Sequence, residues 1–226
     1  MKEIFKINLN KKTYDSVCCR IKQKDQLINI VLEVCSLLLV SIPIESNKYG
    51  ECVINLNNRR IFFSIQDSKD GVFKCFSFHF PFNVEKENDI FNLKTSFGEV
   101  EIHNFHIAAL KAIYSNGGFN EKECRHGILL DFSQLVETTC RELNISSIYE
   151  QEFNRILMEL FNFEPSYIRY DYDEKNENGR LHPLNHLDIY YSQTTTFKLG
   201  CSAFDLNMFM NMLDLNTDCE FLENTK

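Results

Sequence analysis

The stretch from Tyr167 to Tyr191, with the sequence YIRYDYDEKNENGRLHPLNHLDIYY, concentrates side chains that can do chemistry. Its guanidinium, carboxylate and imidazole groups fall mostly at alternating positions. The candidate site residues are Arg169, Asp171, Asp173, His182, His186 and Asp188. Two imidazoles can share proton donation and acceptance near neutral pH. Arg169 and Lys198 can stabilise negative charge that develops on a phosphate or a carboxylate. The first hypothesis for this stretch is therefore general acid–base catalysis.

Two other hypotheses explain the same residues. His182 and His186 are four positions apart, a spacing that suits metal ligation from a helix. Pro183 and the alternating pattern argue against a helix, and no third ligand follows from the spacing, so we expect no metal site and no cofactor. The structural hypothesis pairs Arg169 with an aspartate and lets His186 orient a carboxylate or a backbone carbonyl. We favour this structural hypothesis, because the sequence pattern of an ion-pair network that only stabilises the fold is the same as that of an active site.

Two strands are expected to position these groups. In a strand over 167–173, Arg169 and both following aspartates, Asp171 and Asp173, point to one face. In a second strand over 186–192, His186, Asp188, Tyr190 and Ser192 share one face. Antiparallel pairing then places the arginine, the three aspartates and His186 together, with His182 and Pro183 at the rim. We expect residues 167–199 to form an antiparallel meander.

Hydrophobic periodicity and turn signals predict the remaining elements. Residues 85–96 are polar and are expected to form a loop. Strands are predicted at 51–56, 59–66 and 72–80, and helices at 24–42, 105–114, 131–143, 149–163 and 202–213. Strands that cluster in hairpins predict an α+β fold with a mainly antiparallel sheet. We expect a single domain over 1–226, with an N-terminal half (1–100) and a C-terminal half (101–226).

Composition narrows the class of protein. The 226 residues carry a net charge of −8, with a pI of about 5.3, which does not support a groove for duplex nucleic acid. The 9 cysteines form no C-x-x-C pair, and no secretory signal is visible, so we expect reduced thiols in the cytoplasm. The apolar run at 27–42 is shorter than the roughly 20 residues of a spanning helix. We therefore expect no membrane association.

The charged motif also carries a resemblance. Arg169-x-Asp171-x-Asp173, followed by His182-Pro183-x-x-His186-Leu187, resembles the C-terminal motif of a bacterial family of uncharacterised proteins. The stretch FSFHFPFNV at 76–84 resembles a strand of the same family. Members often carry a His where this chain has Asp188, and an Arg-x-Pro where it has Phe197-Lys198-Leu199. The resemblance implies a prokaryotic origin and gene neighbourhoods of the phage-defence kind.

The first functional hypothesis is an accessory or regulatory subunit of a phage-defence-type assembly. Its partner would be a protein, such as an ATPase or a nuclease from the same operon. An exposed apolar surface on strand 72–80 or on helix 202–213 would receive that partner. The alternative is a metal-independent, His-dependent nuclease or RNase-like effector that uses the 169–188 hairpin. A small-ligand sensor with the polar hairpin as its pocket is a third hypothesis.

Overall fold

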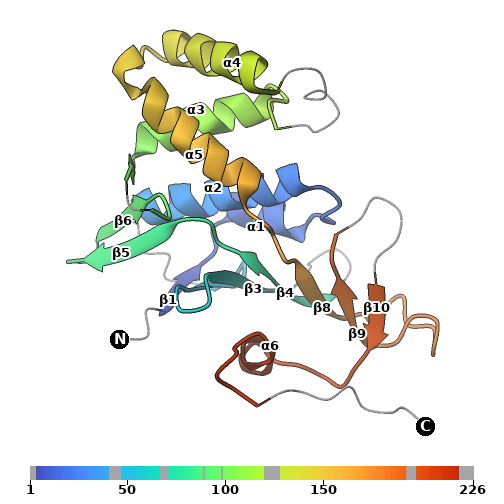
Figure 1. Cartoon of the computed structure of the whole chain (residues 1–226). Coiled ribbons are helices and arrows are strands. Elements are labelled where there is room, and N and C mark those ends of the chain that lie inside the picture. Colours follow the sequence, from blue (N-terminus) through green and yellow to red (C-terminus); the bar gives the residue numbers. More distant parts are fainter. Residues whose placement is uncertain are drawn as a thin grey trace. The chain divides into compact units, whose positions relative to one another are not determined.

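The computed structural model describes residues 4–40, 47–66, 71–88, 90–97, 99–119, 128–191 and 197–218, with only the backbone described for 128–132. The chain has an α+β fold with a seven-stranded and a three-stranded antiparallel sheet, and most of its elements are labelled in Figure 1. The elements form two compact units. Unit 1 contains Met1–Gln23, Ile44–Phe80 and Pro165–Lys226, and unit 2 contains Lys24–Pro43 and Pro81–Glu164. Each unit thus draws residues from both predicted halves of the chain.

The seven-stranded sheet of unit 1 joins two meanders from distant parts of the sequence. Its strand order is β1 (Ile4–Asn8), β2 (Glu51–Asn55), β3 (Arg60–Gln66), β4 (Phe73–His79), β8 (Ile168–Tyr172), β9 (Asn185–Ile189) and β10 (Phe197–Gly200). The predicted strands at 51–56, 59–66 and 72–80 are confirmed, whereas β1 and the short helix α1 (Lys11–Cys18) were not predicted. The meander expected over 167–199 is confirmed by β8, β9 and β10. The pairing of β4 with β8, with Phe76 opposite Arg169, completes the sheet.

Alternation along the strands gives this sheet two buried faces. Phe63, Phe76 and Phe78 lie on one face, where their rings stack with centroid distances of 4.7 Å and 6.0 Å from Phe63. The opposite face carries Phe62 and Tyr170 in a cluster with the C-terminal segment. Because these phenylalanine side chains are buried in the core, the Phe-rich strand does not provide the exposed apolar surface expected of it.

The last helix starts later than predicted. Helix α6 spans Leu206–Met212, and Asp205 is its N-cap, accepting a hydrogen bond of 2.8 Å from the Met208 amide. The predicted start at Ser202 is therefore wrong, because an Asp side chain at the N-cap satisfies the first free amides of the helix. Within α6 only Phe209 is buried, and it packs edge-on against Phe62.

In unit 2, the predicted loop at 85–96 is wrong. Residues 85–87 and 90–94 belong to a hairpin of β5 (Asn83–Glu87) and β6 (Ile90–Lys94), which continues to β7 (Glu101–Ile102), and residue 89 lies outside the described residues. The segment looks polar because only one face of the hairpin is buried, through Val84 and Leu93, which lie opposite each other. On the solvent side Lys94 forms a cross-strand ion pair with Glu85 at 2.8 Å.

The helices among the described residues of unit 2 confirm those predicted there. They are α2 (Lys24–Val40), α3 (Asn104–Ser115), α4 (Ile128–Glu142) and α5 (Glu150–Asn162), the last preceded by a 3₁₀ turn at Ser147–Tyr149. Helix α2 is largely buried and packs against α3 and β6. Residues 41 and 42, the predicted end of that helix, lie outside the described residues. Within the described part of the chain, no helix combines the length and apolarity needed to cross a bilayer.

Candidate functional site

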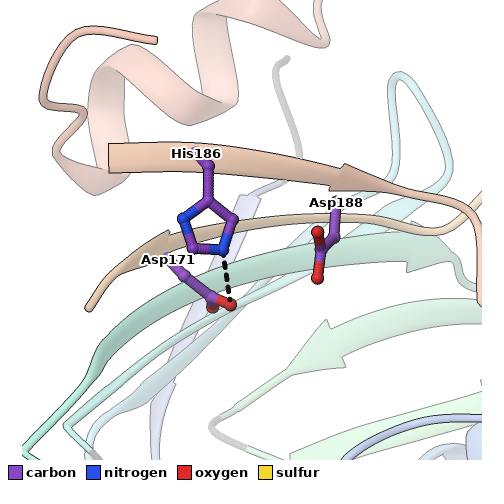
Figure 2. Close-up of side chains that lie close together, drawn as sticks. All are labelled: Asp171, His186 and Asp188. Atoms are coloured by element: carbon purple, nitrogen blue, oxygen red, sulfur yellow. Dashed lines mark ion pairs between the residues drawn. The ribbon is translucent and has the colours of Figure 1, made fainter. Parts of the chain in front are cut away.

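The charged residues of the quoted stretch meet on the hairpin of β8 and β9. The register places Arg169 opposite Asp188 and Asp171 opposite His186. Residues two apart on a strand share a face, so all four side chains project to the same side of the sheet. Figure 2 shows Asp171, His186 and Asp188 on this side. The predicted pairing of the two strands, and the shared face of these four residues, are confirmed.

Arg169 binds both neighbouring carboxylates. Its Nε donates to Asp171 Oδ2 at 2.9 Å, and its Nη2 lies 2.7 Å from the same oxygen. The Nη2 group also donates to Asp188 Oδ2 at 2.5 Å. Both aspartates are buried, so the charges compensate one another away from water. Burial lowers the pKa of the Arg169 guanidinium, but Tyr167 and the two carboxylates outweigh it and raise that pKa overall.

His186 is held between a backbone carbonyl and a carboxylate. Its Nδ1 donates to the Pro183 carbonyl at 2.9 Å, and its Nε2 faces Asp171 Oδ2 at 3.6 Å, the pair marked by the dashed line in Figure 2. Burial lowers the pKa of His186, but the contacts with Asp171 and Pro183 outweigh it, so the pKa is raised. Burial raises the pKa of Asp171, but His186 and Arg169 lower it below its usual value.

Asp173 and His182 form a separate group at the end of the hairpin. His182 Nε2 lies 3.2 Å from Asp173 Oδ2, and Lys198 Nζ lies 2.9 Å from His182 Nδ1. The lysine ammonium can only donate, so His182 donates from Nε2 to Asp173. Asp173 also accepts the backbone amide of Asn176. The Asp173 amide donates to the Leu184 carbonyl at 2.9 Å, so the strand pairing continues one residue past Tyr172, while the Asp173 carboxylate contacts His182 and Asn176.

The alternation predicted for 186–192 also stops early. Strand β9 ends at Ile189, and Tyr190 adopts a left-handed backbone with φ of 68°. This residue interrupts the two-residue repeat. Tyr190 is 54% exposed instead of sharing the face of His186. Tyr191 contacts Tyr167 at a ring distance of 6.4 Å, and Ser192 lies outside the described residues.

The sequence reasoning did not single out three groups of this hairpin that hold its residues in place. Tyr167 is buried beside Arg169, and burial raises its pKa to about 12. Its position two residues before Arg169 was a usable signal, because both then face the same way. Asn185 accepts the Tyr170 hydroxyl at 2.6 Å, and the Pro183 carbonyl orients His186. No signal in the sequence indicates those two contacts.

The site also contains a set of atoms that can hold a metal. Asp171, His186 and Asp188 each offer one ligand atom, and these atoms lie within 4.8 Å of one another. Within the described residues, Asp171 Oδ1 and Asp188 Oδ1 are buried and have no hydrogen-bond partner. The metal hypothesis considered from the sequence paired His182 with His186. The arrangement instead combines one imidazole with two carboxylates, from two strands.

Comparison with known proteins adds no relative from which a role could be transferred. No protein-family model matches the chain, and no curated protein and no solved structure matches it. The resemblance of the Arg-x-Asp-x-Asp and His-Pro-x-x-His-Leu motifs to a bacterial family stays a prediction. We therefore infer the function from the side chains and surfaces of the molecule.

Proposed function

We propose that this protein is an accessory or regulatory subunit of a prokaryotic phage-defence-type assembly and acts through protein–protein contacts. The observation that carries the proposal is the exposed aromatic edge formed by Phe197 on β10 and the adjoining Tyr190. Phe197 is 77% exposed, although a phenylalanine ring favours burial. It lies opposite Ile189, the residue that precedes Tyr190.

Strand β10 is also the last strand of the seven-stranded sheet. Its neighbour in that sheet is β9, and the described residues supply no strand on its other side. The backbone amides and carbonyls of an edge strand form a template for another chain. An extended partner segment can add a strand there while the aromatic side chains supply apolar contact. The exposed aromatic edge therefore combines backbone and side-chain features of a partner site.

The hydrogen bonds and burial of the charged residues favour a role in protein–protein binding over a role in catalysis. Arg169 is engaged with two carboxylates, and the imidazole of His186 is buried. Groups held in this way stabilise the hairpin that presents β10. The phage-defence setting, and a partner such as an ATPase or nuclease from the same operon, are supported by the motif resemblance alone.

The test is co-purification of the full chain from its native operon, with mass spectrometry of the bound proteins. We expect an operon-encoded protein to be retained by the wild type and lost in Phe197→Asp. The matched control is Phe97→Asp, because Phe97 is 88% exposed and belongs to unit 2. Equal retention by both variants, or the absence of any operon-encoded protein, would contradict the proposal.

The second candidate function is the metal-independent nuclease. The observation in its favour is the series of Lys198, His182 and Asp173, in which buried Asp173 and exposed Lys198 orient the partly exposed imidazole of His182 at the rim of the hairpin. If this imidazole is catalytic, His182→Ala loses nucleolytic activity at an unchanged melting temperature. General acid–base loss typically lowers the rate about a hundredfold to ten-thousandfold. Assaying RNA cleavage in the presence of EDTA separates this function from metal-dependent contamination.

A further inference from the structure

We propose that Asp171, His186 and Asp188 bind a divalent transition-metal cation that ties β8 to β9. One ligand comes from β8 and two come from β9, and Figure 2 shows the three side chains projecting from the strands toward a common region. Their ligand atoms lie within 4.8 Å of one another, so small side-chain rotations bring all three onto one ion. This site is independent of the exposed aromatic edge.

The two unpartnered carboxylate oxygens are the first observation that points to a ligand. Asp171 is 4% exposed and Asp188 is 5% exposed. Arg169 occupies Oδ2 of both residues, while Oδ1 of both is buried without a hydrogen-bond partner among the described residues. Buried carboxylate oxygens are nearly always satisfied, and an unpaired one indicates a bound water or ion. Two such oxygens beside an imidazole form a ligand set.

The orientation of His186 is the second observation. Because Nδ1 donates to the Pro183 carbonyl, Nε2 is directed at the carboxylates, which is how metal-ligating imidazoles are commonly oriented. The distance of 3.6 Å from Nε2 to Asp171 Oδ2 exceeds the roughly 2.7–2.9 Å of a charge-assisted hydrogen bond. Because Arg169 already occupies that Oδ2, the ion binds the two free Oδ1 oxygens together with Nε2.

The charges narrow the class of ion. Two carboxylates and the guanidinium of Arg169 leave one net negative charge when His186 is neutral, which attracts a cation and limits how tightly it is held. A mixed set of carboxylate and imidazole ligands suits Mn²⁺, Fe²⁺ or Zn²⁺. Water completes the coordination. Ligands from two adjacent strands make the ion a clamp across the hairpin.

The experiment measures Mn²⁺ binding to the full chain after treatment with EDTA and dialysis, by the electron paramagnetic resonance signal of free Mn²⁺. Mn²⁺ is chosen because the 9 cysteines would also bind a thiophilic ion such as Zn²⁺. We expect one Mn²⁺ per chain. Loss of one ligand in His186→Gln or Asp188→Asn should weaken binding at least tenfold.

The matched control is His182→Gln, which should bind Mn²⁺ like the wild type. The His182 ring lies 4.6 Å from the His186 ring, yet its nitrogens face Asp173 and Lys198. A wild-type chain that takes up no Mn²⁺ at millimolar concentration overturns the proposal, whatever the variants do. Equal weakening in His182→Gln and His186→Gln also overturns it, because binding would then not depend on the predicted ligand set.

Discussion

A single arginine compensates two buried carboxylates, which makes Arg169 the residue whose loss should cost most in the hairpin. In Arg169→Ala, Asp171 and Asp188 lose their shared partner while remaining away from water. Breaking a buried ion pair by removing one partner typically costs about 3–5 kcal/mol. We expect urea denaturation at neutral pH, with EDTA present, to show a loss of that size.

The control for this prediction is Arg155→Ala. Arg155 also forms an arginine–carboxylate pair, with Glu99 at 2.5 Å, but both side chains are largely exposed. Exposed ion pairs contribute about 0–1 kcal/mol, so this variant should unfold almost like the wild type. Equal stability losses in the two variants would show that burial is not what makes Arg169 important.

The buried imidazole of His106 predicts how the stability of the fold depends on pH. His106 in α3 is fully buried, and its Nδ1 accepts the His103 backbone amide at 3.1 Å. Its Nε2 lies 3.1 Å from Glu152 without forming a hydrogen bond, while burial, aided by His103, lowers the pKa of His106 to about 4. The unfolded chain therefore binds a proton more readily than the folded chain between the two pKa values.

The stability that depends on neutral His106 is complete above its unfolded pKa of about 6.5 and is lost as the pH falls toward 4. The shift corresponds to about 3 kcal/mol at most. In His106→Gln this contribution is absent, so the free energy of unfolding should fall less steeply between about pH 6.5 and pH 4. Urea unfolding of the wild type and of His106→Gln between about pH 6.5 and pH 4 checks this prediction. Equal slopes of the free energy of unfolding against pH in the two proteins would refute it.

At the scale of elements, Phe209 is expected to attach α6 to the sheet. It is fully buried and packs edge-on against Phe62 with a ring distance of 6.3 Å. Phe209→Ala should reduce the free energy of unfolding by about 3–5 kcal/mol, as truncation of a buried aromatic does. Met208, 39% exposed in the same helix, supplies the control, since Met208→Ala should change stability by less than about 1 kcal/mol. Comparable losses would mean that α6 is not anchored through Phe209.

Elements with a strong repeat could be predicted from the sequence. The apolar stripe of Phe153, Ile156 and Leu160 predicts helix α5. Alternation along β8 and β9 predicts which face of the sheet carries Arg169 and His186. In such segments the local pattern and the tertiary packing select the same side chains for burial. The meeting of four charged residues on one face was therefore predictable.

The sequence-based predictions that differ from the structure do so for local physical reasons. The hairpin of β5 and β6 was predicted as a loop because its outer face carries charged residues such as Glu85 and Lys94. Tyr190 was misplaced because a positive φ at a tyrosine has no reliable signal in sequence. The proposed ligand set was not considered from the sequence, because it combines His186 with aspartates from two strands, and cross-strand distances depend on register.

At the scale of the whole molecule, neither compact unit is a continuous segment. The chain passes between the units after Gln23, Pro43, Phe80 and Glu164. Cutting at residue 100 separates β4 from β8, so fragment 101–226 loses the strand that pairs with the β8–β9 hairpin. We expect fragments 1–100 and 101–226 to be unfolded alone and to regain dispersed amide NMR spectra when refolded together. A dispersed spectrum from either fragment alone would contradict this.

The pairing of β4 with β8 has a consequence for synthesis on the ribosome. Phe76 and Arg169 are opposite each other in the sheet but about ninety residues apart in the chain. The ribosome adds about 5–20 residues per second. While it translates the segment between the two strands, the edge of β4 next to Phe76 and Phe78 has no strand to pair with. For several seconds the nascent chain thus presents an apolar, unpaired edge, which makes it a natural client for a chaperone at the exit tunnel.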